Sequence, residues 1–89
     1  MKIQIYNFTL VPPNESIDRF DLYEEYQGLK KGKITTKRRC IGWAMTLESC
    51  IGTIIHMNVA ETFEDETITL KQYVDEYKKV KEDIMHILE

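Results

Sequence analysis

Residues 35–60 have the sequence TTKRRCIGWAMTLESCIGTIIHMNVA, in which two alternating runs flank Glu48-Ser49. In the first run, large apolar residues lie on one side, namely Ile41, Trp43, Met45 and Leu47. The other side carries small residues, namely Cys40, Gly42, Ala44 and Thr46. The second run places mostly apolar residues on one side, namely Ile51, Thr53, Ile55, Met57 and Val59. Such alternation is typical of strands, so the stretch predicts a β-hairpin that turns near Glu48-Ser49. A helix over residues 45–55 is the competing interpretation, which the two glycines and the Thr-Ile-Ile run disfavour.

On the N-terminal side, the sequence predicts a strand followed by a helix. Residues 3–11 are rich in Ile, Tyr, Phe, Thr and Val, which strands favour, and Pro12-Pro13 ends the run because proline cannot donate to a sheet. Apolar residues then recur at every third position, with carboxylates between them, at Ile17, Phe20, Tyr23, Tyr26 and Leu29. This spacing predicts an amphipathic helix with a cap at Asn14 or Ser16 and an exit near Gly28 and Gly32.

The C-terminal segment predicts a second helix. Thr69 and Gln72 have the spacing of a capping box, in which each side chain bonds the other residue's backbone N–H. Apolar residues follow at heptad spacing, at positions 70, 73, 77, 80, 84 and 87. A helix of about 20 residues is about 30 Å long. That exceeds the width of a small sheet, so the overhanging Ile84–Leu88 end predicts a homodimer through this helix.

Together these elements predict an α+β fold in the order β-α-β-β-α. The simplest packing is a three-stranded, mainly antiparallel sheet with both helices packed on one face. This is the architecture of a ferredoxin-like fold without its last strand. At 89 residues, with no internal repeat or linker, the chain is expected to form a single domain over residues 1–89.

Composition and motifs exclude several classes of protein. The net charge is −3, and the 43% hydrophobic content is ordinary for a globular protein. The sequence shows neither a signal-peptide pattern nor the roughly 18 consecutive apolar residues of a membrane span, so a cytoplasmic protein without membrane contact is expected. Nucleotide-binding and hydrolase motifs are absent, and the two cysteines and two histidines lack zinc-site spacing. No cofactor, metal or catalytic residue is therefore predicted.

The two cysteines leave one catalytic alternative. Cys40 and Cys50 are interpreted as small, reduced and largely buried residues. If residues 40 and 56 lie on paired strands, however, His56 could serve as a base for the Cys40 thiol, with Arg38 and Arg39 beside it. A thiol-dependent enzyme at Cys40 is the alternative that this pairing would support.

The main candidate binding site is a basic segment. Six of the ten residues from 30 to 39 are basic and none is acidic, namely Lys30, Lys31, Lys33, Lys37, Arg38 and Arg39. Three interpretations stay open: docking on an acidic protein, contact with nucleic-acid phosphates, and a solvated loop that balances an acidic helix. Because Lys37 and Arg39 alternate with Arg38 along an expected strand, only part of the segment is expected to act as one patch.

Aromatic residues supply the second set of candidates, because Trp and Tyr often anchor interfaces. The residues concerned are Trp43, Tyr73 and Tyr77. The sequence thus predicts a small, non-enzymatic, cytoplasmic protein-binding module that acts as an adaptor or inhibitor. Chains of this size and charge pattern are common in phages and mobile elements. The alternative is a nucleic-acid-binding accessory protein that uses Lys30–Arg39, against which stands the acidic pI of about 5.4.

Overall fold

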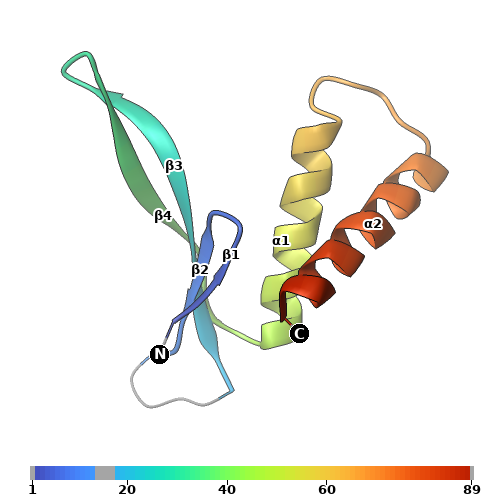
Figure 1. Ribbon diagram of the computed structural model, residues 1–89, viewed down its shortest axis with the longest axis horizontal. Helices are drawn as coiled ribbons and strands as arrows, with labels where there is room; N and C mark the ends of the chain where they lie inside the picture. The colour runs from blue at the N-terminus through green and yellow to red at the C-terminus, as the bar shows by residue number, and fades with distance from the viewer. Residues whose placement is uncertain (1, 14–17, 89) are drawn as a thin grey trace. The chain divides into compact units, whose positions relative to one another are not determined.

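The computed structural model describes residues 2–13 and 18–88. Its elements are four strands followed by two helices: β1 (Ile3–Ile5), β2 (Phe8–Val11), β3 (Phe20–Lys30), β4 (Lys33–Met45), α1 (Leu47–Thr62) and α2 (Leu70–Leu88) (Figure 1). The chain divides into two compact units, Met1–Cys50 and Ile51–Glu89, and each is described by itself. The prediction of a single domain over residues 1–89 stays a prediction.

The first unit holds one antiparallel sheet with the strand order β1-β2-β3-β4. Its N-terminal part is a hairpin rather than the single strand predicted over residues 3–11. The chain reverses at Tyr6-Asn7, where Tyr6 has a positive φ of 55°, and Ile5 then pairs with Phe8. Cross-strand pairing brings Ile5, Phe8, Leu10 and Leu22 to one face, where all four are buried.

The helix predicted over residues 17–29 is wrong, because residues 20–30 form β3. Its proposed caps, Asn14 and Ser16, and its first residue, Ile17, lie outside the described residues. Strand β3 pairs with β2 on one edge and with β4 on the other. Lys31 and Gly32, with φ of 52° and 77°, connect β3 to β4. Positive φ at both central residues is the signature of a type I′ hairpin turn, so Gly32 closes a hairpin instead of ending a helix.

The predicted return strand over residues 51–60 is also wrong. These residues belong to α1, as the competing helical interpretation had it, although the helix covers Leu47–Thr62 rather than residues 45–55. The Thr46 hydroxyl accepts a hydrogen bond from the Ser49 backbone N–H (3.1 Å), which caps the start of α1. The buried residues then follow a helical rather than an alternating spacing, at Cys50, Ile54, Ile55 and Val59. Strand propensity of the Thr-Ile-Ile run is thus outweighed by the cap and by burial along one helical stripe.

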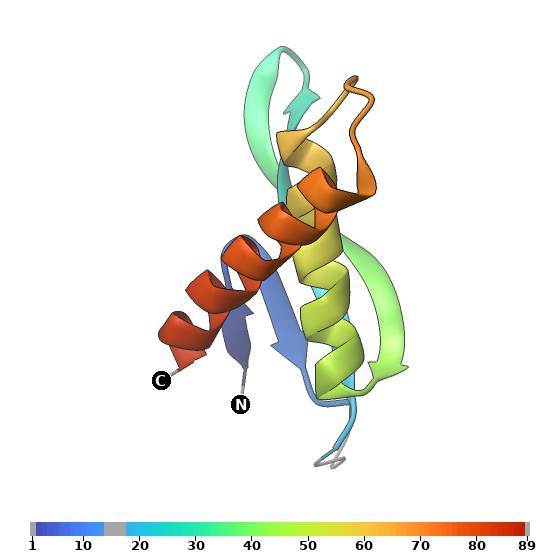
Figure 2. The same cartoon turned by 90° about the vertical axis from the view of Figure 1, so that its right-hand side faces the viewer.

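The C-terminal helix is confirmed as α2. Its capping box is formed: the Gln72 N–H donates to the Thr69 hydroxyl (3.2 Å), and the Thr69 N–H donates to the Gln72 side chain (2.8 Å). In the heptad stripe, Val80 and Ile84 are buried, whereas Leu70 and Ile87 at its ends are 79% and 52% exposed. The two helices run in opposite directions and are joined by a loop (Figures 1 and 2).

The fold is therefore α+β, with a four-stranded antiparallel sheet and two helices in the order β-β-β-β-α-α. This corrects the predicted three strands and the predicted β-α-β-β-α order, and with them the ferredoxin-like arrangement. Packing of both helices on one sheet face stays a prediction. Within the described part of the chain, neither helix is long and apolar enough to cross a membrane.

Candidate functional site

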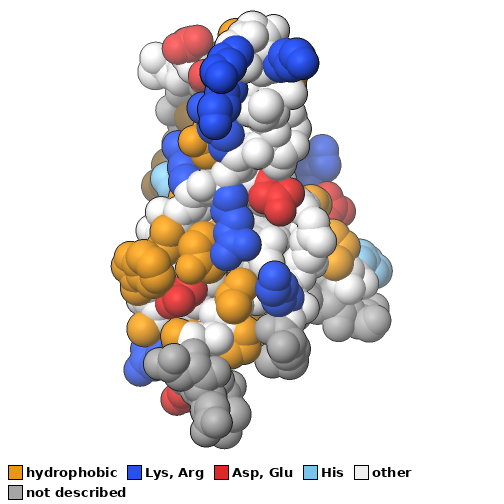
Figure 3. Space-filling view, turned by 90° about the vertical axis from the view of Figure 1, so that its left-hand side faces the viewer, with side chains coloured by type: hydrophobic (Ala, Val, Ile, Leu, Met, Phe, Trp, Pro, Cys, Tyr) orange, Lys and Arg blue, Asp and Glu red, His pale blue; other side chains and the backbone are white. Residues whose placement is uncertain are grey.

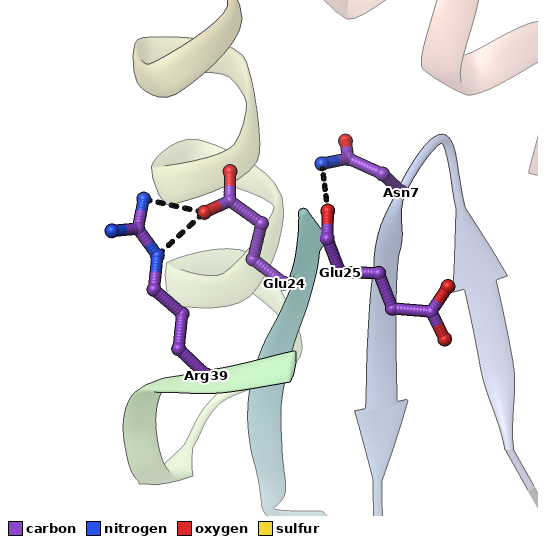
Figure 4. Close-up of polar contacts among 4 residues, drawn as sticks. All are labelled: Asn7, Glu24, Glu25 and Arg39. Atoms are coloured by element: carbon purple, nitrogen blue, oxygen red, sulfur yellow. Dashed lines mark hydrogen bonds and ion pairs between the residues drawn. The ribbon is translucent and has the colours of Figure 1, made fainter. Parts of the chain in front are cut away.

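The outer ends of β3 and β4 form a two-stranded arm. Strand β2 pairs with β3 only between Asp21 and Glu24. The last link is at Glu25, whose N–H donates to the Asn7 carbonyl at 2.8 Å. The Glu25 carbonyl in turn accepts from the Asn7 side chain, also at 2.8 Å (Figure 4). Beyond this point, β3 and β4 are the only described strands that pair, and they extend past the β1–β2 hairpin (Figure 1). We call residues 26–38 the basic arm.

Local hydrogen bonds hold the basic arm together. The Gln27 side chain donates to the Thr36 hydroxyl, and the Thr35 hydroxyl donates to the Gly28 carbonyl, each at 3.4 Å. The absence of a side chain at Gly28 leaves room for Lys37, because a Cβ there would lie 2.8 Å from the Lys37 Cδ and Cε. The arm is therefore a paired ribbon in which one lysine lies flat across the partner strand.

The arm places five of the six predicted basic residues on exposed positions, and Arg39 is exposed at its base. Lys30 lies directly opposite Lys33, and Lys37 lies opposite Tyr26, so these three lysines share one face. Arg38 belongs to the other face, opposite Glu25, and Lys31 lies in the turn. The predicted strand through this segment is confirmed, and with it the division of its charges. Figure 3 shows Lys and Arg side chains concentrated toward one end of the face in view.

Arg39 is the one basic-segment residue with an ion pair among the described residues. Its Nε donates to the Glu24 Oε1 at 2.7 Å, and a terminal guanidinium nitrogen lies 2.5 Å from the same oxygen (Figure 4). The guanidinium also lies 5.4 Å from the centre of the Tyr26 ring. Arg39 is thus partly neutralised and stiffens the base of the arm, whereas the cations nearer the tip keep their charge available.

A second group of side chains lies where the arm joins the sheet. Arg38 stacks over the Tyr23 ring at 3.9 Å, and Tyr23 meets Trp43 edge to face at 6.3 Å. Trp43 itself is 69% exposed. A bulge in the β3–β4 pairing lies beside it, where Ala44 has a positive φ of 48° and donates its N–H to Asp21 (2.9 Å). Bulges redirect side chains, and this one accompanies an outward-facing tryptophan.

The tip of the arm carries an apolar pair that the sequence-based interpretation missed. Leu29 and Ile34 lie directly opposite each other, one residue from the lysines that flank the turn. They are 72% and 75% exposed. Leu29 was interpreted as the core side of a helix. The signal that could have placed it outside is the Lys-Gly pair between two strand-like runs, since such a pair can close a two-residue hairpin.

The remaining candidates from the sequence are Tyr73 and Tyr77, and the pair of Cys40 and His56. Tyr73 and Tyr77 neighbour each other on α2 at 6.0 Å, and the Tyr73 hydroxyl lies 3.0 Å from His56 Nδ1. Because His56 lies on α1, the paired strands that were to join it to Cys40 do not exist.

Both cysteines are free, with Cys40 half-buried and Cys50 buried. The Cys40 thiol donates to the Gly42 carbonyl at 3.5 Å. Burial, and to a lesser extent the Asp21 carboxylate, raises the pKa of the Cys50 thiol above its ordinary value. Cys50 is therefore held in its neutral form, which is the unreactive one.

Among the described residues, no three His, Cys, Asp or Glu side chains come together as a metal site. No protein-family model, curated protein or solved structure matches the chain. The functional proposal therefore rests on the geometry and charge of the basic arm.

Proposed function

We propose that the protein binds nucleic acid by laying the basic arm against the phosphate backbone of a groove. The observation that carries the proposal is a protruding two-stranded ribbon whose exposed cations have no acidic residue among them. Five residues per strand beyond β2 give the ribbon a reach of about 17 Å, at about 3.3 Å per residue. Proteins place β-strands of this kind in the major or the minor groove of duplex DNA.

The distribution of charge supports a polyanionic ligand in spite of the acidic pI. The basic arm holds five of the chain's 12 basic residues and none of its 15 acidic residues. The rest of the chain therefore has seven basic residues against 15 acidic ones. Because the rest of the chain carries more acidic than basic residues, a phosphate backbone is attracted mainly to the arm, which orients the encounter. The overall pI hides this local polarity.

Two features of the arm destabilise the folded ribbon and are explained by the binding of a polyanion. Lys30 and Lys33 are directly opposite each other, and like charges in that position destabilise a strand pair. Lys31 occupies a left-handed position of a type I′ turn, which Asn, Asp or Gly would fill with less strain. A bound phosphate backbone would neutralise all three charges, so the unfavourable placement supports a polyanionic ligand.

The proposal is tested with fluorescence anisotropy on a labelled DNA duplex of about 25 base pairs at low salt. The test variant is Lys30→Gln/Lys33→Gln/Lys37→Gln, and the matched control is Lys78→Gln/Lys79→Gln/Lys81→Gln, which removes three exposed charges from α2. We expect the arm variant to lose at least about tenfold in affinity, and the control to lose far less. Equal losses, or no binding by the wild type at 50 mM salt, would refute the proposal.

A second candidate function is the binding of a protein partner, as an adaptor or inhibitor. The observation that favours it is the cluster of Arg38, Tyr23 and exposed Trp43, since Arg, Tyr and Trp dominate the energetics of protein interfaces. Affinity capture from the native host lysate would test it: a partner retained by the arm variant and lost by Trp43→Ala supports this function. In either case we propose a cytoplasmic protein that binds and does not catalyse.

A further inference from the structure

The apolar pair at the arm tip has no evident part in folding. Leu29 and Ile34 lie beyond the last residue of β3 that pairs with β2, and both are about three-quarters exposed. Only one other large apolar residue of the described chain, Leu70, is more exposed than these two. A cross-strand pair of this kind contributes about 0.2–1 kcal/mol to a ribbon, which a polar β-branched pair would also supply. Two bulky aliphatic side chains at a solvated tip therefore point to a ligand.

The charges around the pair define what that ligand must be. Lys30 directly follows Leu29, and Lys33 directly precedes Ile34. Lys31 lies between the two lysines, in the turn. Leu29 and Ile34 share one face, whereas Lys30 and Lys33 share the other. The surface that accepts this tip must present an apolar slot beside closely spaced negative charges. Stacked base pairs between two phosphate backbones have that chemistry.

We infer that Leu29 and Ile34 form a wedge that enters between two base pairs of duplex DNA from the minor groove and bends the duplex. This inference rests on the proposed function and names its ligand as a deformable DNA duplex. Aliphatic wedges partly unstack a base step and bend the helix by about 20–90° toward the major groove. The three lysines at the tip contact the phosphates on either side of the opened step, which offsets the cost of unstacking.

An anionic membrane is the other surface with apolar and negative parts, and the arm is less suited to it. Beyond Glu25 the arm is two strands wide, so both of its edges carry backbone N–H and C=O groups without a neighbouring described strand. Each such group costs several kcal/mol if it is buried in hydrocarbon. In a DNA groove the same edges face base edges, sugars and water, all of which form hydrogen bonds. The membrane is therefore kept as an outcome of the test.

The wedge predicts a sequence preference without a base-specific contact. Pyrimidine–purine steps such as TA unstack most readily, whereas A-tracts are stiff. Two duplexes of equal length, one with a central TA step and one with a central A-tract, should therefore differ in the bending that the protein produces and in affinity.

The test measures bending and binding on the same sample. A 30-base-pair duplex carries a donor and an acceptor at its two ends, so bending raises the transfer efficiency, and 2-aminopurine at the TA step brightens when the step unstacks. The test variant Leu29→Thr/Ile34→Thr keeps β-branched residues in the ribbon. The matched control, Leu47→Thr, removes another exposed aliphatic residue. A third variant, Leu29→Val/Ile34→Val, retains an apolar tip.

We expect the wild type, the control and the valine variant to raise transfer efficiency and 2-aminopurine fluorescence as they saturate the TA duplex. The threonine variant should bind with at most about a tenfold loss of affinity and leave both signals unchanged. Wild-type binding without bending, or bending by the threonine variant, overturns the wedge and leaves the proposed function standing. Failure to bind any duplex at low salt overturns both. Partition into phosphatidylserine vesicles that the threonine variant loses, with no bending of DNA, overturns the wedge in favour of a membrane.

Discussion

At the scale of single residues, backbone strain at Ala44 accompanies the exposure of Trp43. Ala44 is a non-glycine residue with a positive φ, at a bulge where β4 departs from regular pairing with β3. The left-handed conformation costs an L-residue about 1–2 kcal/mol. Here the hydrogen bond from the Ala44 N–H to the Asp21 carboxylate partly offsets that cost.

We expect Ala44→Gly to raise the free energy of unfolding by about 1 kcal/mol, because glycine adopts positive φ without a Cβ clash. Urea denaturation of the variant and the wild type would measure the change. The matched control is Ala60→Gly in the last turn of α1, where glycine should instead lower stability, by at most about 1 kcal/mol. A loss of stability at residue 44 equal to that at residue 60 would contradict a strained Ala44.

The raised pKa of Cys50 makes stability depend on pH in the alkaline range. The folded state holds the thiol neutral, whereas the unfolded thiol ionises with the ordinary pKa of 9.0. The contribution of the neutral Cys50 thiol to the free energy of unfolding is therefore complete below pH 9. It decreases as the pH rises toward the higher pKa of the folded state. We expect the free energy of unfolding to fall more steeply above pH 9 in the wild type than in Cys50→Ala. Urea denaturation between pH 7 and 10 measures both, and parallel curves would argue against a buried neutral thiol.

At the scale of elements, Lys31 in the Lys31-Gly32 turn is expected to lower the stability of the protein and to strengthen its binding to DNA. Asparagine tolerates the left-handed conformation better than lysine does, so Lys31→Asn should stabilise the protein by up to about 1 kcal/mol. The same substitution removes a cation from the tip and should weaken duplex binding several-fold. Thermal denaturation and anisotropy would report the two effects in one variant. Lower stability together with unchanged affinity would contradict both the turn type and the role of the lysine.

Sequence patterns identified some elements and misassigned others for physical reasons. Helix α2 was predictable because its cap and its apolar stripe are local signals that agree. Strand β3 was mistaken for a helix because Phe20, Tyr23 and Tyr26 have helical spacing. In the sheet, Phe20 is buried, Tyr23 packs against Trp43, and Tyr26 is exposed on the arm. Helix α1 was mistaken for a strand because β-branched residues alternate along it, and burial follows the helical stripe instead.

The candidate site was predictable in composition but not in shape. The cluster of basic residues is visible in the sequence, and alternation correctly divided Lys37 from Arg38. The pairing register, which puts Lys30 opposite Lys33 and Leu29 opposite Ile34, depends on the turn at Lys31-Gly32. That turn could not be found while Gly32 was interpreted as a helix exit. The misassignment of Gly32 is therefore the reason why the arm and its apolar tip were not predicted.

At the scale of the whole molecule, self-association through α2 is a separate expectation. Leu70 and Ile87, at the two ends of the heptad stripe, are exposed and would be covered in a homodimer. We expect light scattering at about 100 µM to give twice the monomer mass of 10.6 kDa. Leu70→Glu/Ile87→Glu should return the protein to a monomer, because charges do not fit an apolar seam. A wild-type monomer at that concentration would argue against the dimer.

The basic arm holds five of the chain's 12 basic residues and no acidic residue. The salt dependence of DNA binding reports directly on how many of these cations contact phosphates. If all five cations of the basic arm contact phosphates, the logarithm of the binding constant should fall with the logarithm of the salt concentration with a slope of about −4.5. Lys30→Gln/Lys33→Gln/Lys37→Gln should reduce the slope by about 3, whereas Lys78→Gln/Lys79→Gln/Lys81→Gln should leave it nearly unchanged. The same slope in all three proteins, or no measurable binding at 50 mM salt, would show that the basic arm is not a nucleic-acid-binding element.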